Sequence, residues 1–132
     1  MYSAKVLNIF KNPMNAGGLQ GSTAIGKYES ETDVVKLYIK TNEANVVVEA
    51  KFKSFGNVLT IVCSSILTEL ITGKHIDELL EISNDKIVSI IDEIPEEKQY
   101  VLDVMQQVLV SAVQDFYKRK EKEEKNKTKA KV

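Results

Sequence analysis

The chain has 132 residues, enough for one domain with its own hydrophobic core. Hydrophobic residues make up 43% and charged residues 28%, which excludes a disordered or collagen-like chain. Lys and Arg number 18 against 19 Asp and Glu, and no segment approaches the roughly 20 apolar residues of a membrane span. The first residues lack the apolar segment of a signal peptide, so we expect a cytoplasmic protein that does not bind membranes.

The chain contains one cysteine, Cys63, and one histidine, His75. A disulfide within the chain and a Cys₄ or Cys₃His zinc site are therefore excluded. Cys63 lies four residues from Leu59 and from Leu67, which predicts a buried thiol that packs as a small hydrophobic residue. A lone ligand or a persulfide acceptor is the alternative. His75 has no partner at ligand spacing, so we expect it at the surface.

The first half of the chain predicts a helix followed by strands. Residues 4–11 have helical spacing, with Ser3 as the N-cap, and residues 14–22 read as a loop. Residues 33–40 and 45–53 alternate, which predicts an antiparallel hairpin, and a weaker strand is expected near residues 23–28. The inward face of the second predicted strand is Val46, Val48, Ala50 and Phe52.

From Asn57 onward the apolar period becomes helical. A helix is expected from Asn57 to Gly73, followed by short helices over 75–82 and 84–91 and a long helix from Pro95 to about Lys120. The apolar stripe of the long helix is Val101, Val104, Met105, Val108, Ala112 and Phe116. The predicted fold is α+β: a small antiparallel sheet of about three strands, helices packed on it, and a long C-terminal helix.

The charge is distributed unevenly along the chain. Residues 1–117 hold 10 Lys and Arg against 16 Asp and Glu, whereas residues 118–132 hold 8 against 3. This predicts a folded domain over residues 1–118 and a basic, disordered tail over residues 119–132. A docking tail for an acidic partner or RNA is the alternative. The tail has no aromatic residue to stack on bases, so we expect no nucleic-acid partner.

Several short motifs occur in an order that resembles one family. They are Asn12-Pro13-Met14-Asn15-Ala16-Gly17, Asp33-Val34-Val35-Lys36-Leu37, Phe52-Lys53-Ser54-Phe55-Gly56, Ser64-Ser65 with Thr68-Glu69 and Thr72-Gly73-Lys74, Ile94-Pro95-Glu96-Glu97-Lys98, and Asp115-Phe116-Tyr117. Their order and spacing from residue 2 to about 118 are similar to those of the IscU-type, NifU N-terminal-like iron–sulfur cluster scaffolds. The resemblance implies the SufE/NifU-like architecture of that family.

The resemblance also implies a site. Family members hold a nascent cluster, or zinc, through three cysteines, a histidine and an aspartate. Those positions correspond here to Glu31, Asn57 and Val101 for the cysteines, Tyr100 for the histidine, and Asp33 for the aspartate. The thiolates that suit iron in a sulfide cluster are therefore absent. Asn57 loses the ligand but keeps the helix-capping chemistry of its position, so we expect it to cap the helix that follows.

Only weak metal binding by carboxylates is left for this chain. Glu31 and Asp33 would share one face of an extended segment, which makes them the candidate ligands for a metal ion. Two solvated acids at the entrance of a strand are the alternative.

By resemblance, we expect a non-enzymatic, scaffold-like protein in iron–sulfur cluster assembly. The alternative is a scaffold fold without a cluster that acts as a protein-interaction or regulatory module. The partners implied are a cysteine desulfurase or other assembly proteins, and a homo-oligomer is possible. An unrecognised enzyme has no catalytic constellation to support it.

Overall fold

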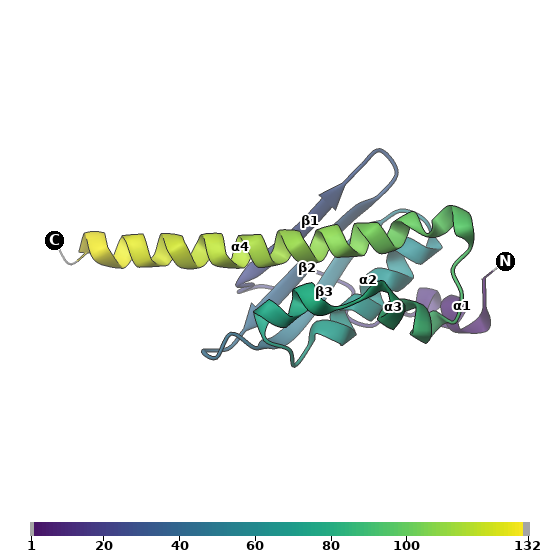
Figure 1. The fold of residues 1–132 in the computed structure, drawn as a ribbon, viewed down its shortest axis with the longest axis horizontal. Coiled ribbons are helices and arrows are strands. Elements are labelled where there is room, and N and C mark those ends of the chain that lie inside the picture. Colours follow the sequence, from purple (N-terminus) through teal and green to yellow (C-terminus); the bar gives the residue numbers. More distant parts are fainter. Residues whose placement is uncertain (1, 131–132) are drawn as a thin grey trace.

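The computed structural model describes residues 2–130, with the side chains of residues 2–127. Three strands and four α-helices, with two short 3₁₀ helices, make up one α+β fold (Figure 1). In chain order the elements are α1 (Ala4–Lys11), β1 (Ala24–Glu29), β2 (Val34–Thr41), β3 (Val47–Phe55), α2 (Val58–Ile71), η1 (Ile76–Glu81), α3 (Asn84–Ile91), η2 (Glu96–Lys98) and α4 (Tyr100–Ala130).

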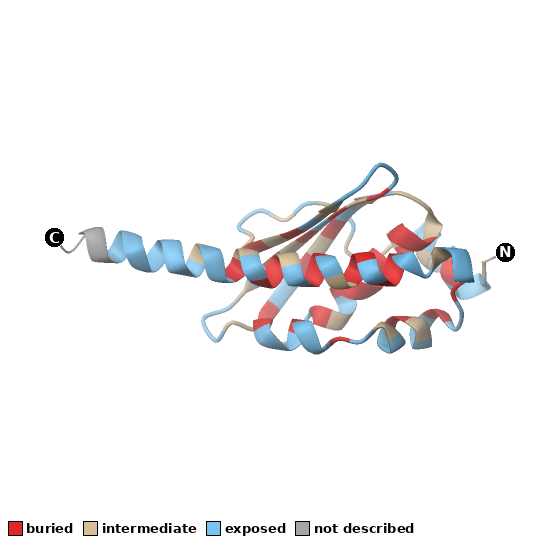
Figure 2. Cartoon of the chain, turned by 45° about the horizontal axis from the view of Figure 1, so that its top comes forward, coloured by how far each residue is buried: buried red, intermediate tan, exposed pale blue. Residues whose placement is uncertain are grey.

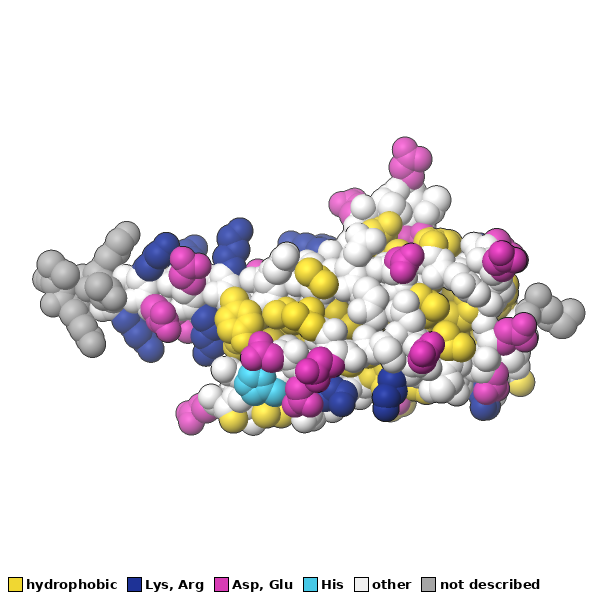
Figure 3. Space-filling model, viewed as in Figure 1, with side chains coloured by type: hydrophobic (Ala, Val, Ile, Leu, Met, Phe, Trp, Pro, Cys, Tyr) yellow, Lys and Arg dark blue, Asp and Glu magenta, His cyan; other side chains and the backbone are white. Residues whose placement is uncertain are grey.

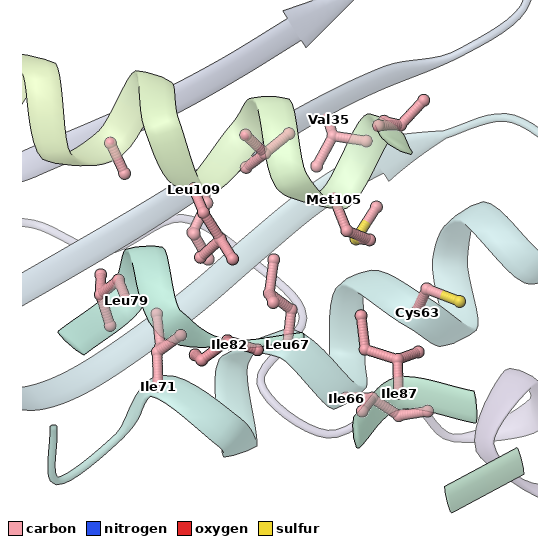
Figure 4. Packing of buried hydrophobic residues seen from close by; sticks show 14 of the residues in the cluster. Val35, Cys63, Ile66, Leu67, Ile71, Leu79, Ile82, Ile87, Met105 and Leu109 are labelled. Atoms are coloured by element: carbon pink, nitrogen blue, oxygen red, sulfur yellow. The ribbon is translucent and has the colours of Figure 1, made fainter. Parts of the chain in front are cut away.

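The sheet is antiparallel with strand order β1-β2-β3, and α2, α3 and α4 lie on one side of it (Figure 1). The core fills the layer between sheet and helices (Figure 2). Leu67 of α2 and Met105 and Leu109 of α4 point into this layer (Figure 4). The predicted fold class is confirmed, and the predicted apolar stripe of the long helix is buried throughout.

The structure confirms the predicted start of α1 and differs from the predictions for two later helices. Ser3 Oγ accepts a hydrogen bond from Val6 N at 3.2 Å, so Ser3 is the N-cap of α1. The long helix begins later than predicted: after Pro95 the chain forms the 3₁₀ turn η2, and α4 starts at Tyr100. The segment predicted as a helix over 75–82 is the 3₁₀ helix η1, for which His75 is the N-cap.

The predicted inward face of β3 is wrong at its first residues. Val47 is buried, whereas Val48 is 50% exposed, and the inward face continues at Ala50 and Phe52. The pairing shifts between Lys40 and Thr41, so one residue of β3 has no partner on β2. Such a β-bulge reverses the alternation of side chains, and sequence periodicity cannot locate it.

Helix α4 covers the outer edge of β1. The backbone N–H of Ile25 donates to Asp115 Oδ2 at 2.8 Å, and that of Lys27 donates to Ser111 Oγ at 2.9 Å. Edge N–H groups that would otherwise be open to other strands are thereby bonded within the chain. The helix approaches so closely at Gly26 that a Cβ there would meet the Val108 carbonyl oxygen and, at 2.9 Å, Ala112 Cβ.

The expected disordered tail is helical in the structure. Helix α4 continues to Ala130 and extends beyond the body, with residues 121–127 exposed (Figures 1 and 2). Lys, Glu and Arg are good helix formers, and elongation of an existing helix needs no new nucleus. The pair Lys125–Glu121, at 3.2 Å, supports this segment. Residues 131–132 lie outside the described residues, and the domain boundary at residue 118 stays a prediction.

No helix within residues 2–130, the long α4 included, is both long and apolar enough to cross a bilayer.

We expect Gly26→Ala to destabilise the fold by about 2 kcal/mol, because the added methyl group forces α4 away from β1. Urea denaturation monitored by circular dichroism measures this change. Gly18→Ala is the control: its Cβ would lie 3.3 Å from Lys53 Cε, the end region of a flexible side chain, so we expect a change below about 0.5 kcal/mol. Equal losses in the two variants would contradict the close packing of α4 on β1.

Candidate functional site

The family ligand positions meet where three elements come together: the β1–β2 turn, the start of α2 and the start of α4. The structure links Asp33, Asn57 and Tyr100 by hydrogen bonds, although Asn57 and Tyr100 are 43 residues apart. Glu31 and Val101 are not part of this group. We refer to Asp33, Asn57, Thr60 and Tyr100 as the polar cluster.

Asp33 is the centre of the polar cluster and is only 1% exposed. Its Oδ1 accepts a short hydrogen bond from Thr60 Oγ1. Its Oδ2 accepts from Thr32 Oγ1 at 2.8 Å and from the Tyr100 hydroxyl at 3.0 Å. A Cβ at Gly56 would meet Asp33 Oδ1, so the glycine allows the carboxylate to approach the start of α2. Three donors thus surround a buried carboxylate.

The pKa of Asp33 reflects a balance between burial and these donors. Burial by itself raises the pKa of the carboxyl group. The hydrogen bonds from Thr60, Thr32 and Tyr100, together with the positive charge of Lys98, outweigh burial and hold the pKa below its usual value. Asp33 is therefore ionised at neutral pH.

Asn57 uses both ends of its side-chain amide. Its Oδ1 accepts from the backbone N–H of Leu59 at 2.9 Å and of Thr60 at 3.3 Å, which caps α2. Its Nδ2 donates to the Tyr100 hydroxyl at 2.8 Å. Asn57 thus keeps the predicted capping role and also joins α2 to α4.

Tyr100 links Asn57 to Asp33 through two hydrogen bonds of its hydroxyl group. Its hydroxyl oxygen accepts from Asn57, and its O–H donates to Asp33. Burial raises the pKa of Tyr100, and the hydrogen bond and the negative charge of Asp33 raise it further. The phenol is therefore protonated at neutral pH and acts as a donor.

Glu31 and Asp33 do not form the expected pair of carboxylates. The segment between β1 and β2 is a turn in which Ser30 N donates to Asp33 O at 2.8 Å, so it is not extended. Glu31 is exposed on this turn, whereas Asp33 is buried. The alternative of two solvated acids is also wrong for Asp33. Val101 is fully buried and packs in the core.

The only thiol of the chain lies in the core. Cys63 is on α2, fully buried among hydrophobic side chains (Figure 4). Burial raises its pKa to about 12, so the thiolate needed for metal binding or persulfide chemistry is strongly disfavoured. His75 caps η1, where its Nδ1 accepts from Asp77 N at 3.1 Å.

The polar cluster does not fit an iron–sulfur cluster or a structural zinc ion. Its possible metal ligands are hydroxyl, amide and carboxylate groups. Iron–sulfur clusters and structural zinc ions are held mainly by thiolate or imidazole ligands. Among the described residues, no three His, Cys, Asp or Glu side chains are close enough together to hold a metal ion. The side-chain oxygen and nitrogen atoms of Asp33, Asn57 and Tyr100 are hydrogen-bonded to one another.

Sequence reasoning did not identify Thr60 or Thr32 as part of the site. Thr60 lies 27 residues from Asp33, and both threonines read as ordinary polar residues. The weak signal was the glycine at residue 56, which predicts a close approach of something to the start of α2.

The motifs and the fold together define an α+β domain of the iron–sulfur scaffold type. The sequence profile of the NifU-like N terminal domain matches residues 1–123. The chain therefore belongs to the NifU-like N-terminal domain family, which confirms the resemblance.

Curated relatives cover most of the chain. The iron–sulfur cluster assembly scaffold protein IscU of Buchnera aphidicola subsp. Acyrthosiphon pisum is 36% identical over 90% of this chain and 97% of that protein. The protein of the same name from Escherichia coli K12 is 31% identical over 91% of this chain and 97% of that protein. A third relative, IscU 1 of Archaeoglobus fulgidus, is 31% identical over 95% of this chain and 82% of that protein.

A solved structure has the same fold. It is a putative iron–sulfur cluster assembly scaffold protein for the SUF system from Fervidobacterium islandicum, with a TM-score of 0.67, 14% identity, and coverage of 87% of this chain and 96% of that chain.

We expect Asp33→Asn to lower the free energy of unfolding by about 2–3 kcal/mol at pH 7, because an amide group places a donor against donors and lacks the negative charge. The folded-state pKa of Asp33 is lowered, so this stability is fully present above the unfolded pKa of about 3.9. It is lost as the pH falls through the folded pKa. Urea denaturation at a series of pH values measures the difference between wild type and variant.

Glu31→Gln is the matched control, since Glu31 is an exposed acid in the same turn and its removal should leave the pH dependence unchanged. The predicted role of Asp33 would be contradicted if the stabilities of wild type and Asp33→Asn stayed parallel into the acid range.

Proposed function

We propose that this protein acts in iron–sulfur cluster assembly as a protein-interaction module that keeps the scaffold fold and carries no cluster of its own. The observation that carries the proposal is the polar cluster, in which the side chains at three of the five family ligand positions, Asp33, Asn57 and Tyr100, are hydrogen-bonded to one another. The family membership and the names of the relatives support the process.

Binding a metal here would require the polar cluster to open. Asn57 could turn toward a metal only by releasing the N-cap of α2, which costs about 1 kcal/mol. A metal bound by Asp33 would also have to displace hydrogen bonds that its carboxylate accepts from three side-chain hydroxyl groups. These costs oppose ligation by the residues present.

The second candidate is a scaffold that still binds a metal ion through oxygen ligands. The ionised carboxylate of Asp33 at a family ligand position favours it. Its weakness is that both carboxylate oxygens already accept hydrogen bonds and that Glu31 faces solvent.

The module has no chemistry of its own in this proposal and is not an enzyme. Its partners are other assembly proteins of the cytosol, with a cysteine desulfurase or a scaffold with complete ligands as the first candidates. Its contribution would be to bind such a partner through the surface of the shared fold.

Anaerobic reconstitution with Fe²⁺, sulfide and a thiol, followed by desalting, tests the proposal. We expect the wild-type protein to retain neither the visible absorption of a cluster nor stoichiometric iron and sulfide, because no accessible thiolate is present. The IscU protein of E. coli, treated in parallel, is the positive control for the procedure. A stoichiometric cluster on the wild-type chain would overturn the proposal.

A Glu31→Cys, Asn57→Cys, Val101→Cys variant places thiols at the three family positions in the same fold. We expect this variant to retain more iron and sulfide than the wild type. A Cys63→Ser variant should not differ from wild type, because that thiol is buried.

A further inference from the structure

The face of the sheet opposite the helices carries a row of lysines. Side chains alternate along each strand, so the residues that are not in the core point away from the helices. The pairing places Lys27 of β1 opposite Lys36 of β2, and Lys36 opposite Lys53 of β3. All three are exposed. We call these three residues the lysine row.

More positive charge lies beside the lysine row. Lys51 is opposite Tyr38 in the next row of the same face, and Lys40 of β2 is opposite Glu49 of β3. These five lysines are half of the ten Lys and Arg in residues 1–117, which hold 16 acids. The acids at outward-facing strand positions are Glu29 and Glu49.

The helical side of the molecule has the opposite character. Acidic side chains gather over the body in that view, and basic ones gather on the extension of α4 (Figure 3). The domain with an acidic balance therefore concentrates its positive charge on one sheet face and on the end of one helix.

The lysine row opposes folding of the isolated chain. Like charges directly opposite each other on neighbouring strands are destabilising. The ion pairs found among the described side chains involve Lys5, Arg119 and Lys125, and none of them uses a lysine of this face. Among the described side chains, no acid therefore lies within ion-pair distance of the lysine row.

Protection of sheet edges does not explain the row either. Lysines often keep edge strands from pairing with other chains. Here side chains of α4 accept hydrogen bonds from the backbone N–H groups at the edge of β1. At the edge of β3, Gly17 N donates to Phe52 O at 2.7 Å. Moreover, Lys36 lies on the central strand, which has no free edge.

We propose that this sheet face is the docking surface of the protein and that its partner is an acidic protein surface. The inference rests on the proposed function, for which it names the surface and the chemistry of the partner. A row of three unpaired ammonium groups attracts carboxylates, speeds their encounter and sets their orientation.

A protein partner fits this face better than a nucleic acid or a second copy of the chain. Glu29 and Glu49 interrupt the positive charge toward two corners of the face, which disfavours a continuous polyphosphate. Tyr38 is half-buried, so its ring is not free to stack on a base. A symmetric dimer through this face would bring the lysine rows of two copies together, and they would repel each other.

Fluorescence anisotropy with a labelled 16-residue peptide of alternating Glu and Ala, titrated with the full chain at low salt, tests the proposal. We expect the variant Lys27→Gln, Lys36→Gln, Lys53→Gln to bind the peptide about tenfold or more weakly than the wild type, since about 1.4 kcal/mol is a factor of ten. The control variant Lys11→Gln, Lys74→Gln, Lys86→Gln removes the same charge elsewhere and should bind within about twofold of the wild type.

Thermal melting of both variants shows that they are folded. Because the row repels itself, its neutralisation should leave Tm unchanged or raise it by a few degrees, at about 2–8 °C per kcal/mol. Weaker binding with equal or higher Tm supports a docking role, which a structural role for the lysines would not produce.

Three outcomes would overturn the proposal: no binding of the peptide by the wild type, equal weakening in both triple variants, or tighter binding of a single-stranded oligothymidylate of equal charge than of the peptide. These readouts need neither iron nor sulfide. A wild-type chain that carries a cluster but binds the peptide through the lysine row would therefore overturn the proposed function alone. A wild-type chain that carries no cluster and does not bind the peptide would overturn this inference alone.

Discussion

A buried carboxylate must be surrounded by donors, and this requirement at Asp33 determines how three elements of the fold meet. An unpaired carboxylate in this place would cost several kcal/mol. Thr32 from the β1–β2 turn, Thr60 from α2 and Tyr100 from α4 supply the donors. Each of these elements is held in place by the same negative charge.

The consequences of this requirement extend into the neighbouring backbone. Residue 56 has to be glycine, because a side chain there would occupy the space of the carboxylate. Asn57 follows it and caps α2 while it binds Tyr100. Three of the family ligand positions, residues 33, 57 and 100, thus belong to one hydrogen-bonded arrangement, in which their side chains depend on one another. From Tyr100, α4 continues along the edge of β1, so the polar cluster also fixes where the longest helix begins.

How much of this could be predicted from the sequence depended on whether a feature is local. The helix over residues 4–11, the capping role of Asn57 and the apolar stripe from Val101 to Phe116 all leave periodic or short-range signals, and the structure agrees with them. The bulge at Val48 leaves no such signal, because one extra residue reverses a face without altering composition. The hydrogen bond from Thr60 to Asp33 connects residues 27 positions apart and leaves no signal in either segment.

The same distinction applies to the candidate surfaces. The sequence resemblance named Asp33, Asn57 and Tyr100 as separate positions, and only the fold showed that they bind one another. Lys27, Lys36 and Lys53 are spaced unevenly along the chain, and they become a row only when the register of the strands is known. Helix α4 continues beyond its predicted end near Lys120, because a charged composition that is typical of disorder also favours a helix when Lys and Glu alternate.

These features fit a domain whose fold is complete without a ligand. A protein that binds a metal at such a site gains stability in proportion to the logarithm of the free metal concentration divided by its dissociation constant. In this chain the contacts at the corresponding place are intramolecular, so the proposed function predicts no such dependence through the polar cluster. Self-repulsion remains on the opposite side of the sheet, where the three lysines of the lysine row lie opposite one another and take part in none of the described ion pairs. An acidic partner that binds there relieves repulsion in an otherwise satisfied fold, and this gain requires no rearrangement of the domain.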